Sequence, residues 1–154
     1  MFFQNHYHQT VGTIVAVLMG AMMSFACIFV DDLPRTLPTF FNGWGLITLI
    51  VLLVSFTIPG QSLGEKFTTA LGIKKGTLSF LLVANLIPSL INNTFCTLGG
   101  AAVSAFSNSM LSFAEQGALW MKMCLRDWPV MLVISYIASL LAQQAGVAVA
   151  KKNT

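Results

Sequence analysis

Charge is scarce in this sequence. Only 8% of its 154 residues are Asp, Glu, Lys or Arg, whereas 56% are hydrophobic. Because a soluble domain is about one-quarter charged, this balance favours a membrane protein over a soluble one. Eight basic and five acidic residues leave a net charge of +3, but the basic residues are scattered over loops and the C-terminal tail and form no basic stripe for nucleic acid. We therefore expect the lipid bilayer as the main partner and no nucleic acid.

Residues for metal or covalent chemistry are equally sparse. The three cysteines, Cys27, Cys96 and Cys124, are odd in number and widely spaced, which fits neither a disulfide framework nor a zinc site. His6 and His8 form a short pair near the N-terminus, but the sequence offers no third ligand nearby. We expect no catalytic residue, no metal site, no cofactor and no enzymatic activity.

Four long apolar stretches dominate what remains. Each approaches or exceeds the ~20 residues that cross a bilayer core, and backbone in lipid must satisfy its own hydrogen bonds, so each is predicted to be a helix. The stretches are 11–30, 40–60, 78–102 and 128–150. No basic residue precedes the first one, which therefore fits a retained anchor better than a cleaved signal. We expect an all-α membrane protein in which residues 1–154 form a single four-helix transmembrane bundle.

The connections differ in length and character. The first, 31–39, is short, the second, 61–77, carries three lysines, and the third, 106–127, has a pattern of its own. There Ser112 and Glu115 have the spacing of a capping box. Charged side chains then fall on one stripe of a helix: Glu115, Lys122 and Arg126. We expect an amphipathic helix in the membrane interface or against the bundle, followed by a last span that begins near Asp127 and Pro129.

Basic residues also predict the orientation. With four spans, the N-terminus, the second connection and the tail share one side, which holds five Lys or Arg residues; the other side holds three. The positive-inside bias then places both termini in the cytoplasm.

A weak internal repeat is visible. Gly12-Thr13-Ile14 opens the first span and Gly76-Thr77-Leu78 the third, while the second and fourth spans open on FFNGW and LRDWP. Duplication of a two-helix unit, 11–60 and 76–150, would produce a parallel repeat about an axis normal to the membrane. Chance similarity among apolar helices is the alternative.

Small residues recur four apart in two spans. They are Gly12, Ala16, Gly20 and Ser24 in the first, and Ala138, Ala142, Gly146 and Ala150 in the fourth. This spacing lets helix backbones approach closely. Ordinary packing within the bundle is the favoured interpretation, and a dimerising face is the alternative.

The third span carries the candidate functional residues. Asn85, Ser89, Asn92 and Asn93 share one helix face around Pro88. Such a face either hydrogen-bonds neighbouring helices, with Ser55, Ser139 or Gln143 as partners, or lines a solute path. No charged residue or histidine lies in the middle of a span, whereas proton-coupled carriers usually keep one there. Small drug/proton exporters are therefore a poor match.

Short motifs carry one resemblance. MMSF at 22–25 and the span openings FFNGW and LRDWP resemble a bacterial family of small membrane proteins of unknown function, in which a two-helix unit occurs singly or in tandem. The third span departs from it, since Pro88-Ser89 replaces the Met-Ser step. The resemblance implies a bacterial cytoplasmic membrane and no particular activity. We expect a structural or accessory component of a membrane complex, acting with a second copy or another membrane protein; the alternative is a small transporter or channel-like protein that uses the polar face.

Overall fold

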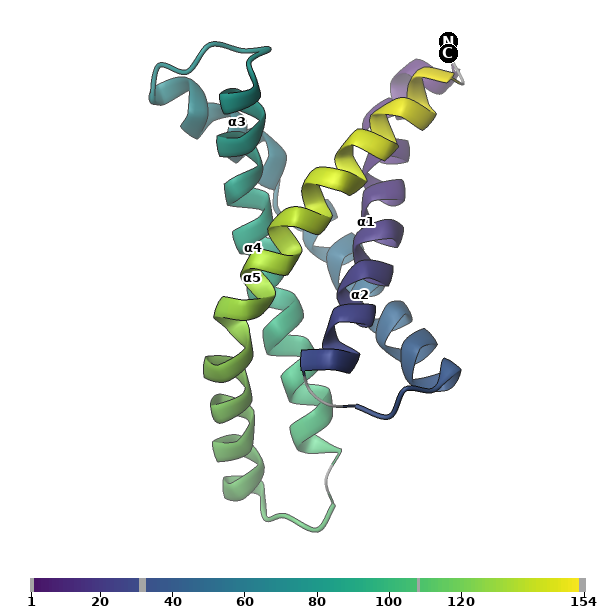
Figure 1. The fold of residues 1–154 in the computed structure, drawn as a ribbon, viewed down its shortest axis with the longest axis vertical. Coiled ribbons are helices and arrows are strands. Elements are labelled where there is room, and N and C mark those ends of the chain that lie inside the picture. The colour runs from purple at the N-terminus through teal and green to yellow at the C-terminus, as the bar shows by residue number, and fades with distance from the viewer. Residues whose placement is uncertain (1, 31–32, 108, 153–154) are drawn as a thin grey trace.

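All regular secondary structure in the described part of the chain is helical. The computed structural model describes residues 2–30, 33–107 and 109–152, with side chains described between 12 and 145 in those ranges. These residues form five helices and no strand (Figure 1): α1 Phe2–Val30, α2 Leu37–Thr57, α3 Gly60–Ala70, α4 Leu78–Phe106 and α5 Phe113–Lys152. Four segments are long and apolar enough to cross a membrane: Gly12–Val30, Leu37–Thr57, Leu78–Phe106 and Phe113–Ala145. The predicted all-α class with four spanning helices is confirmed, and these spans mark a multi-pass membrane protein.

The ends of α2 follow from threonine and proline. Thr36 caps the helix by accepting a hydrogen bond from the Thr39 amide at 3.3 Å, the usual role of a threonine before a first turn. The helix ends at Thr57 because Ile58 precedes Pro59 and is held in an extended conformation. A second helix, α3, begins immediately afterwards, so the connection predicted at 61–77 is helical over most of its length.

The predicted capping box at the start of α5 is confirmed. The Glu115 carboxylate accepts from the Ser112 amide at 2.8 Å, and the Glu115 amide donates to the Ser112 hydroxyl at 3.4 Å. From there the helix continues through Asp127 and Pro129 without a break. Pro129 therefore lies inside a helix of 40 residues, and the segment expected as a separate amphipathic helix forms the first turns of α5.

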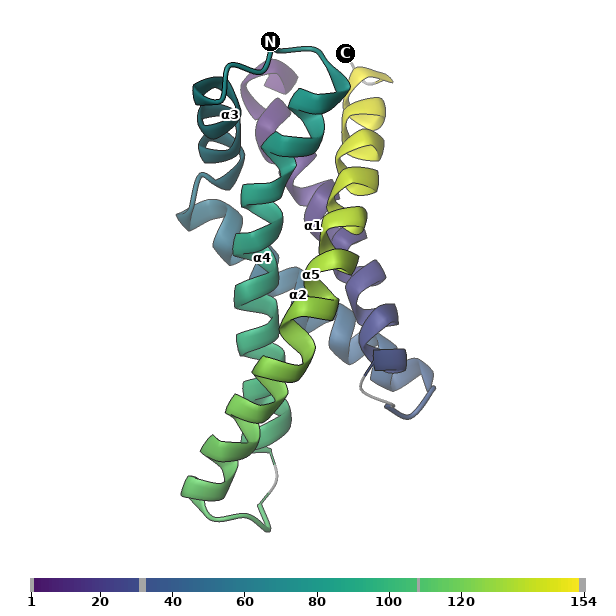
Figure 2. The ribbon, with the colours of Figure 1, turned by 60° about the vertical axis from the view of Figure 1, so that its left-hand side comes forward.

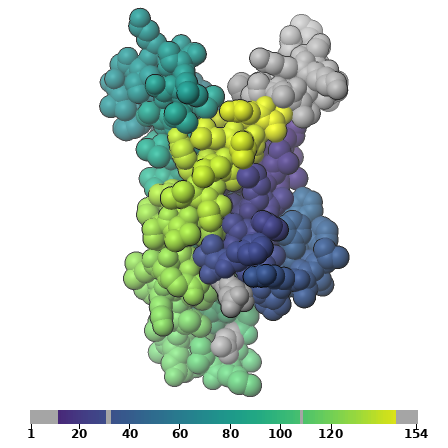
Figure 3. Space-filling model, viewed as in Figure 1, coloured from purple at the N-terminus to yellow at the C-terminus, as the bar shows by residue number. Residues whose placement is uncertain are grey.

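Figures 1 and 2 show α5 crossing the molecule from the lower part of α4 to the upper part of α1. It packs on both of these helices, while α2 packs on α1 and α4, and α3 packs on α4. The start of α1 and the end of α5 lie at the same end of the bundle as α3. At the opposite end the α4–α5 hairpin extends beyond the α1–α2 hairpin (Figure 3).

The bundle buries small and sulfur-containing side chains and turns large apolar ones outward. Its buried cluster includes Met19, Met23, Val51 and Met131. Phe25, Leu53 and Phe56, by contrast, are more than half exposed. Such outward apolar faces on every spanning helix are costly in water and suit lipid.

The predicted small-residue stripes face protein, as expected. Ala16, Gly20 and Ser24 are buried on α1, and Ala138 and Ala142 on α5. A Cβ on Gly20 would collide with Thr48 of α2, whose backbone nitrogen would be only 3.1 Å away. Gly12 is partly exposed, and the side-chain environments of positions 146 and 150 lie outside the described residues.

Candidate functional site: the polar face of α4 and its cavities

The predicted polar face is buried. Asn85, Ser89 and Asn93 are each at most 1% exposed, and Asn92 is 9% exposed. The prediction that these residues point into the bundle is therefore confirmed. Their surroundings nevertheless divide them into two groups.

Asn85 is the centre of a hydrogen-bond network between α4 and α5. Its Oδ1 accepts from Ser139 Oγ at 2.9 Å and from Gln143 Nε2 at 2.8 Å. Its Nδ2 donates to Ser89 Oγ at 3.2 Å and to the carbonyl of Tyr136 at 3.4 Å. Both the oxygen and the nitrogen of the amide have hydrogen-bond partners, as burial away from water requires. Ser139 and Gln143 are two of the three partners that the sequence predicted.

Asn93 also bonds to α5, but less completely. Its Nδ2 donates to the carbonyl of Trp128 at 3.0 Å, and the Trp128 indole donates to Thr94 Oγ1 at 3.1 Å. The Asn93 Oδ1 is buried without a hydrogen-bond partner among the described residues. Asn85 and Asn93 thus both act as links between helices.

Asn92 faces a cavity instead. Among the described side chains, no hydrogen bond holds its amide. The cavity has a volume of about 370 Å³, is lined by residues of all five helices and is partly open; we call it the amide cavity. Its polar lining residues are Ser55, Gln61, Glu65, Asn92, Ser139 and Gln143. Pro88 borders it as well, so the polar face of α4 lines the cavity at the position of the proline.

A smaller cavity of about 210 Å³ adjoins the first at the end of the bundle where α3 lies. Gln61, Glu65 and Gln143 line both cavities. Gln143 donates to Gln61 Oε1 at 3.1 Å, so this amide pair stands between the two spaces. The smaller cavity reaches Gly76 and Thr77 in the exposed loop before α4.

The position of α3 depends on Gly64 and Pro88. Proline has no amide proton, so Pro88 leaves the carbonyl of Ala84 without its helical donor. A Cβ on Gly64 would collide with that carbonyl oxygen and would lie 3.2 Å from Pro88 Cδ. The glycine hydrogen that replaces the Cβ therefore faces the freed carbonyl, in the manner of a weak C–H···O contact.

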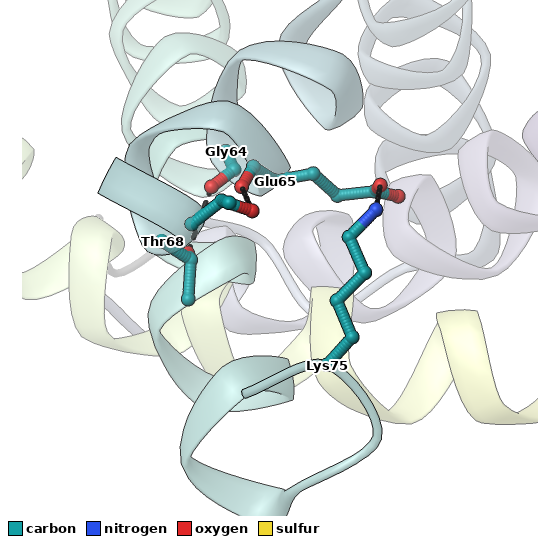
Figure 4. A network of polar contacts seen from close by, with 5 residues as sticks. Gly64, Glu65, Thr68 and Lys75 are labelled. Carbon is teal, nitrogen blue, oxygen red and sulfur yellow. Dashed lines mark hydrogen bonds and ion pairs between the residues drawn. The ribbon is translucent and has the colours of Figure 1, made fainter. Parts of the chain in front are cut away.

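Further contacts fix α3 and its following loop (Figure 4). Thr68 Oγ1 donates to the carbonyl of Gly64 at 2.8 Å, and Lys75 Nζ lies 3.6 Å from the Glu65 carboxylate. The ion pair is solvent-exposed, with 69% of the lysine side chain and 46% of the glutamate side chain accessible. The negative charge of Glu65 beside the two cavities is therefore paired with the positive charge of Lys75.

Other polar residues of α2 and α5 do not join the network. Ser135 donates to a carbonyl of its own helix, as does Thr57, and Gln144 is exposed. Gln61 and Glu65 were missed by the sequence reasoning because their helix was expected to be a loop. The signal that could have found them is the polar sequence GQSLGE directly after a proline at a membrane boundary.

Each of the three tryptophans donates a hydrogen bond to a neighbouring helix. Trp44 donates to the Val17 carbonyl of α1 at 2.9 Å, and Trp120 donates to the Leu98 carbonyl of α4 at 3.0 Å. Together with the Trp128 bond, they tie the two helices of each hairpin together.

Within the described residues, no three His, Cys, Asp or Glu side chains are grouped so as to hold a metal ion. Comparisons of the chain with protein-family models, with curated proteins and with solved structures found no match. Conclusions about function therefore depend on the residues of this chain, and the resemblance to the small bacterial membrane proteins stays a hypothesis.

Proposed function

We propose that this protein is a small membrane transporter or channel-like protein that takes a small, uncharged polar solute into the amide cavity. The observation that carries the proposal is that Asn92 faces this cavity at the proline of α4, unlike Asn85 and Asn93, whose amides bond to α5. Within the described residues its amide group makes no hydrogen bond, which leaves it available to a solute.

The lining suits an uncharged molecule with hydrogen-bonding groups. A solute leaving water needs replacement donors and acceptors, and the cavity offers amides and hydroxyls on α3, α4 and α5. Glu65 is the charged lining residue, and Lys75 lies beside it at 3.6 Å. A neutral solute avoids the desolvation cost that an ion would meet in lipid.

The route would begin at the loop before α4. A solute would enter the smaller cavity near Thr77, pass the Gln61–Gln143 pair and reach Asn92. Gln143 is also held by its hydrogen bond to Asn85, so the pair opens when the Gln61 side chain turns away. Side-chain rotation of this kind is fast, and the pair can therefore act as a constriction without a large backbone movement.

The test is solute flux into liposomes that contain the purified protein. Glycerol and urea serve as probes, and the swelling rate is recorded after rapid mixing. Asn92→Leu should reduce the rate to that of empty liposomes while leaving the protein folded. Asn93→Leu is the matched control and should keep wild-type flux, because Asn93 bonds to Trp128 instead. Flux of neither probe in the wild-type protein, or equal flux in both variants, would contradict the proposal.

A second candidate function, an accessory component of a membrane complex, is favoured by the tip of the α4–α5 hairpin. This tip extends past the α1–α2 hairpin (Figure 3), and Met110 and Phe113 there are 94% and 80% exposed. A photo-crosslinker at position 113 in native membranes distinguishes the cases, since a protein adduct supports the accessory function and lipid adducts alone oppose it.

We further propose a bacterial cytoplasmic membrane with both termini in the cytoplasm. In support, α3 and its loop, which carry Lys66, Lys74 and Lys75, lie at the same end as the start of α1 and the end of α5. Basic residues thus gather at that end, as the positive-inside bias expects.

Two finer proposals concern the helices. The first turns of α5 would lie in the opposite interface, because they belong to the hairpin tip and carry Lys122 and Arg126. The tandem duplication is supported by one feature that the two hairpins share. In each, a tryptophan near the predicted start of the second spanning helix donates a hydrogen bond to the first helix of the same hairpin. Trp44 bonds to α1, and Trp128 bonds to α4.

A further inference from the structure

The direction of every hydrogen bond in the amide network follows from one fixed acceptor, the backbone carbonyl of Tyr136. A carbonyl oxygen only accepts, so the group of Asn85 that lies 3.4 Å from it is the amide nitrogen Nδ2. The other side of this amide, the Asn85 Oδ1, is then an acceptor that faces Ser139 and Gln143. Both of these side chains must donate to it.

These bonds use the protons of both side chains. Gln143 Nε2 has two protons, and it donates to Asn85 Oδ1 at 2.8 Å and to Gln61 Oε1 at 3.1 Å. Ser139 has one hydroxyl proton, which it donates to Asn85 Oδ1 at 2.9 Å. Ser139 and Gln143 both line the amide cavity, but neither keeps a proton for a solute there.

The wall that the two polar cavities share therefore presents mainly acceptors. Gln143 Oε1 makes no hydrogen bond with the described part of the chain. The Glu65 carboxylate, which is paired with Lys75, also only accepts. Gln61 keeps its Nε2 protons, but this residue is exposed to water. A solute that passes this wall must supply protons of its own.

Asn92 offers the complementary group. It lines the amide cavity alone, whereas Gln143 and Glu65 line both cavities. Because its amide makes no hydrogen bond among the described residues, its Nδ2 can donate to a solute. A solute lying between Asn92 and the shared wall is therefore matched when it accepts on one side and donates on the other.

We propose, as an extension that rests on the proposed function, that the amide cavity selects neutral solutes that donate hydrogen bonds, and that urea and small primary amides are the class it fits best. The N–H groups of such a solute bond to Gln143 Oε1 and to the Glu65 carboxylate, and its carbonyl accepts from Asn92 Nδ2. A solute without protons displaces water from these acceptors and leaves them without partners, which is costly away from bulk water.

The test compares three neutral probes in the liposome swelling assay, each corrected for empty liposomes. Urea and glycerol both donate hydrogen bonds, whereas trimethylamine N-oxide only accepts them. Urea should enter at least about tenfold faster than trimethylamine N-oxide, which forfeits the bonds to Gln143 and Glu65. Glycerol has more heavy atoms than trimethylamine N-oxide but should also enter faster, and this result separates selection by hydrogen bonding from selection by size.

Glu65→Gln changes the wall by replacing a group that only accepts with one that also donates. This substitution should lower the ratio of the urea rate to the trimethylamine N-oxide rate by about fivefold, the equivalent of about one hydrogen bond. Lys75→Gln is the matched control, because it breaks the same ion pair but keeps the carboxylate. Its ratio should equal that of the wild type.

The outcomes distinguish this inference from the function on which it rests. Equal entry of urea and trimethylamine N-oxide, or exclusion of glycerol together with trimethylamine N-oxide, would overturn the inference while urea flux still supports the proposed function. A ratio that is unchanged in Glu65→Gln, or that falls equally in Lys75→Gln, would overturn it as well. Entry of neither urea nor glycerol would instead overturn the proposed function, and the inference with it.

Discussion

Replacing Asn85 with leucine tests whether the amide network holds α4 against α5. Leucine has a similar shape but neither donor nor acceptor, so the substitution removes hydrogen bonds with little change in volume. Three of the bonds at Asn85 reach α5, through Ser139, Gln143 and the Tyr136 carbonyl. An interhelical hydrogen bond in a membrane protein contributes about 0.6 kcal/mol on average, so we expect a loss of about 2 kcal/mol in the free energy of unfolding.

Asn93→Leu is the informative comparison because the same substitution should have a different effect about two helical turns further along the same face of α4. It removes one bond, to the Trp128 carbonyl, at about 0.6 kcal/mol. It also removes a buried Oδ1 that lacks a partner among the described residues, and relief of such an atom returns about 1 kcal/mol. The two contributions nearly cancel, and we expect stability close to that of the wild type.

The assay is reversible unfolding of the purified protein in mixed micelles, followed by tryptophan fluorescence. Trp120 and Trp128 of α5 both bond to α4, so two of the chain's three tryptophans report on separation of these helices. If Asn93→Leu proves as costly as Asn85→Leu, or if both are neutral, the hydrogen-bond network described for Asn85 does not stabilise the bundle.

Three other predictions follow from close contacts and from charge. Gly20→Leu should destabilise the bundle by about 1–3 kcal/mol, because its side chain would meet the backbone of Thr48; Val17→Leu, on an exposed side chain, should be neutral in the same unfolding assay. Gly64→Ala should undock α3 from α4, seen as faster proteolysis after Lys66, since the new methyl group would collide with the Ala84 carbonyl; unchanged cleavage would contradict this. A reporter enzyme that is active only in the cytoplasm should be active when fused after Thr154. Activity of a reporter that works only on the outer face would contradict the proposed topology.

The spanning helices were predictable because a single physical requirement determines them. A stretch of about 20 apolar residues has few alternatives to a membrane helix, and the structure has four of them. Local signals also worked at helix starts, where Ser112 and Glu115 form the predicted capping box. The polar face of α4 was predictable from helical periodicity alone.

The helix α3 was not predictable in the same way. Its sequence, GQSLGEKFTTA, has two glycines and little apolar character, and a helix of 11 residues is marginal by itself. Its stability comes from docking, through Gly64 at the Ala84 carbonyl and through buried Thr68. That contact requires the position of α4, which no local pattern in 60–70 contains.

The continuity of α5 was missed for a related reason. A proline often occupies a first helical turn, which made Pro129 a reasonable start for the last span. In the structure the helix runs through it, and both flanks pack on neighbours: Trp120 bonds to α4 and Tyr136 to the Leu82 carbonyl. Tertiary contacts on both sides can offset the hydrogen bond that proline removes.

The different roles of the asparagines also needed the structure. Periodicity places Asn85, Asn92 and Asn93 on one face, but it does not show which of them meets α5 and which meets a cavity. Asn92 borders the amide cavity because residues of α1, α2 and α3 line the opposite walls of that space. The four helices predicted from the sequence, without α3, could not show which asparagine faces the cavity and which bond to α5.

The amide cavity should work independently of a further cavity that α4 borders. That further cavity, of about 350 Å³, is lined by Ile47 of α2 and Cys96 of α4, whereas Val54 and Asn92 line the amide cavity. Asn92 and Cys96 are one helical turn apart, about 6 Å along the axis, and Val51, between Ile47 and Val54, is packed at 1% exposure. We therefore expect Asn92→Leu to stop solute flux and Cys96→Ser to keep the wild-type rate in the same liposome swelling assay. If Cys96→Ser stops flux as well while the protein stays folded, the packed layer at Val51 does not isolate the cavities, and the solute path continues through both.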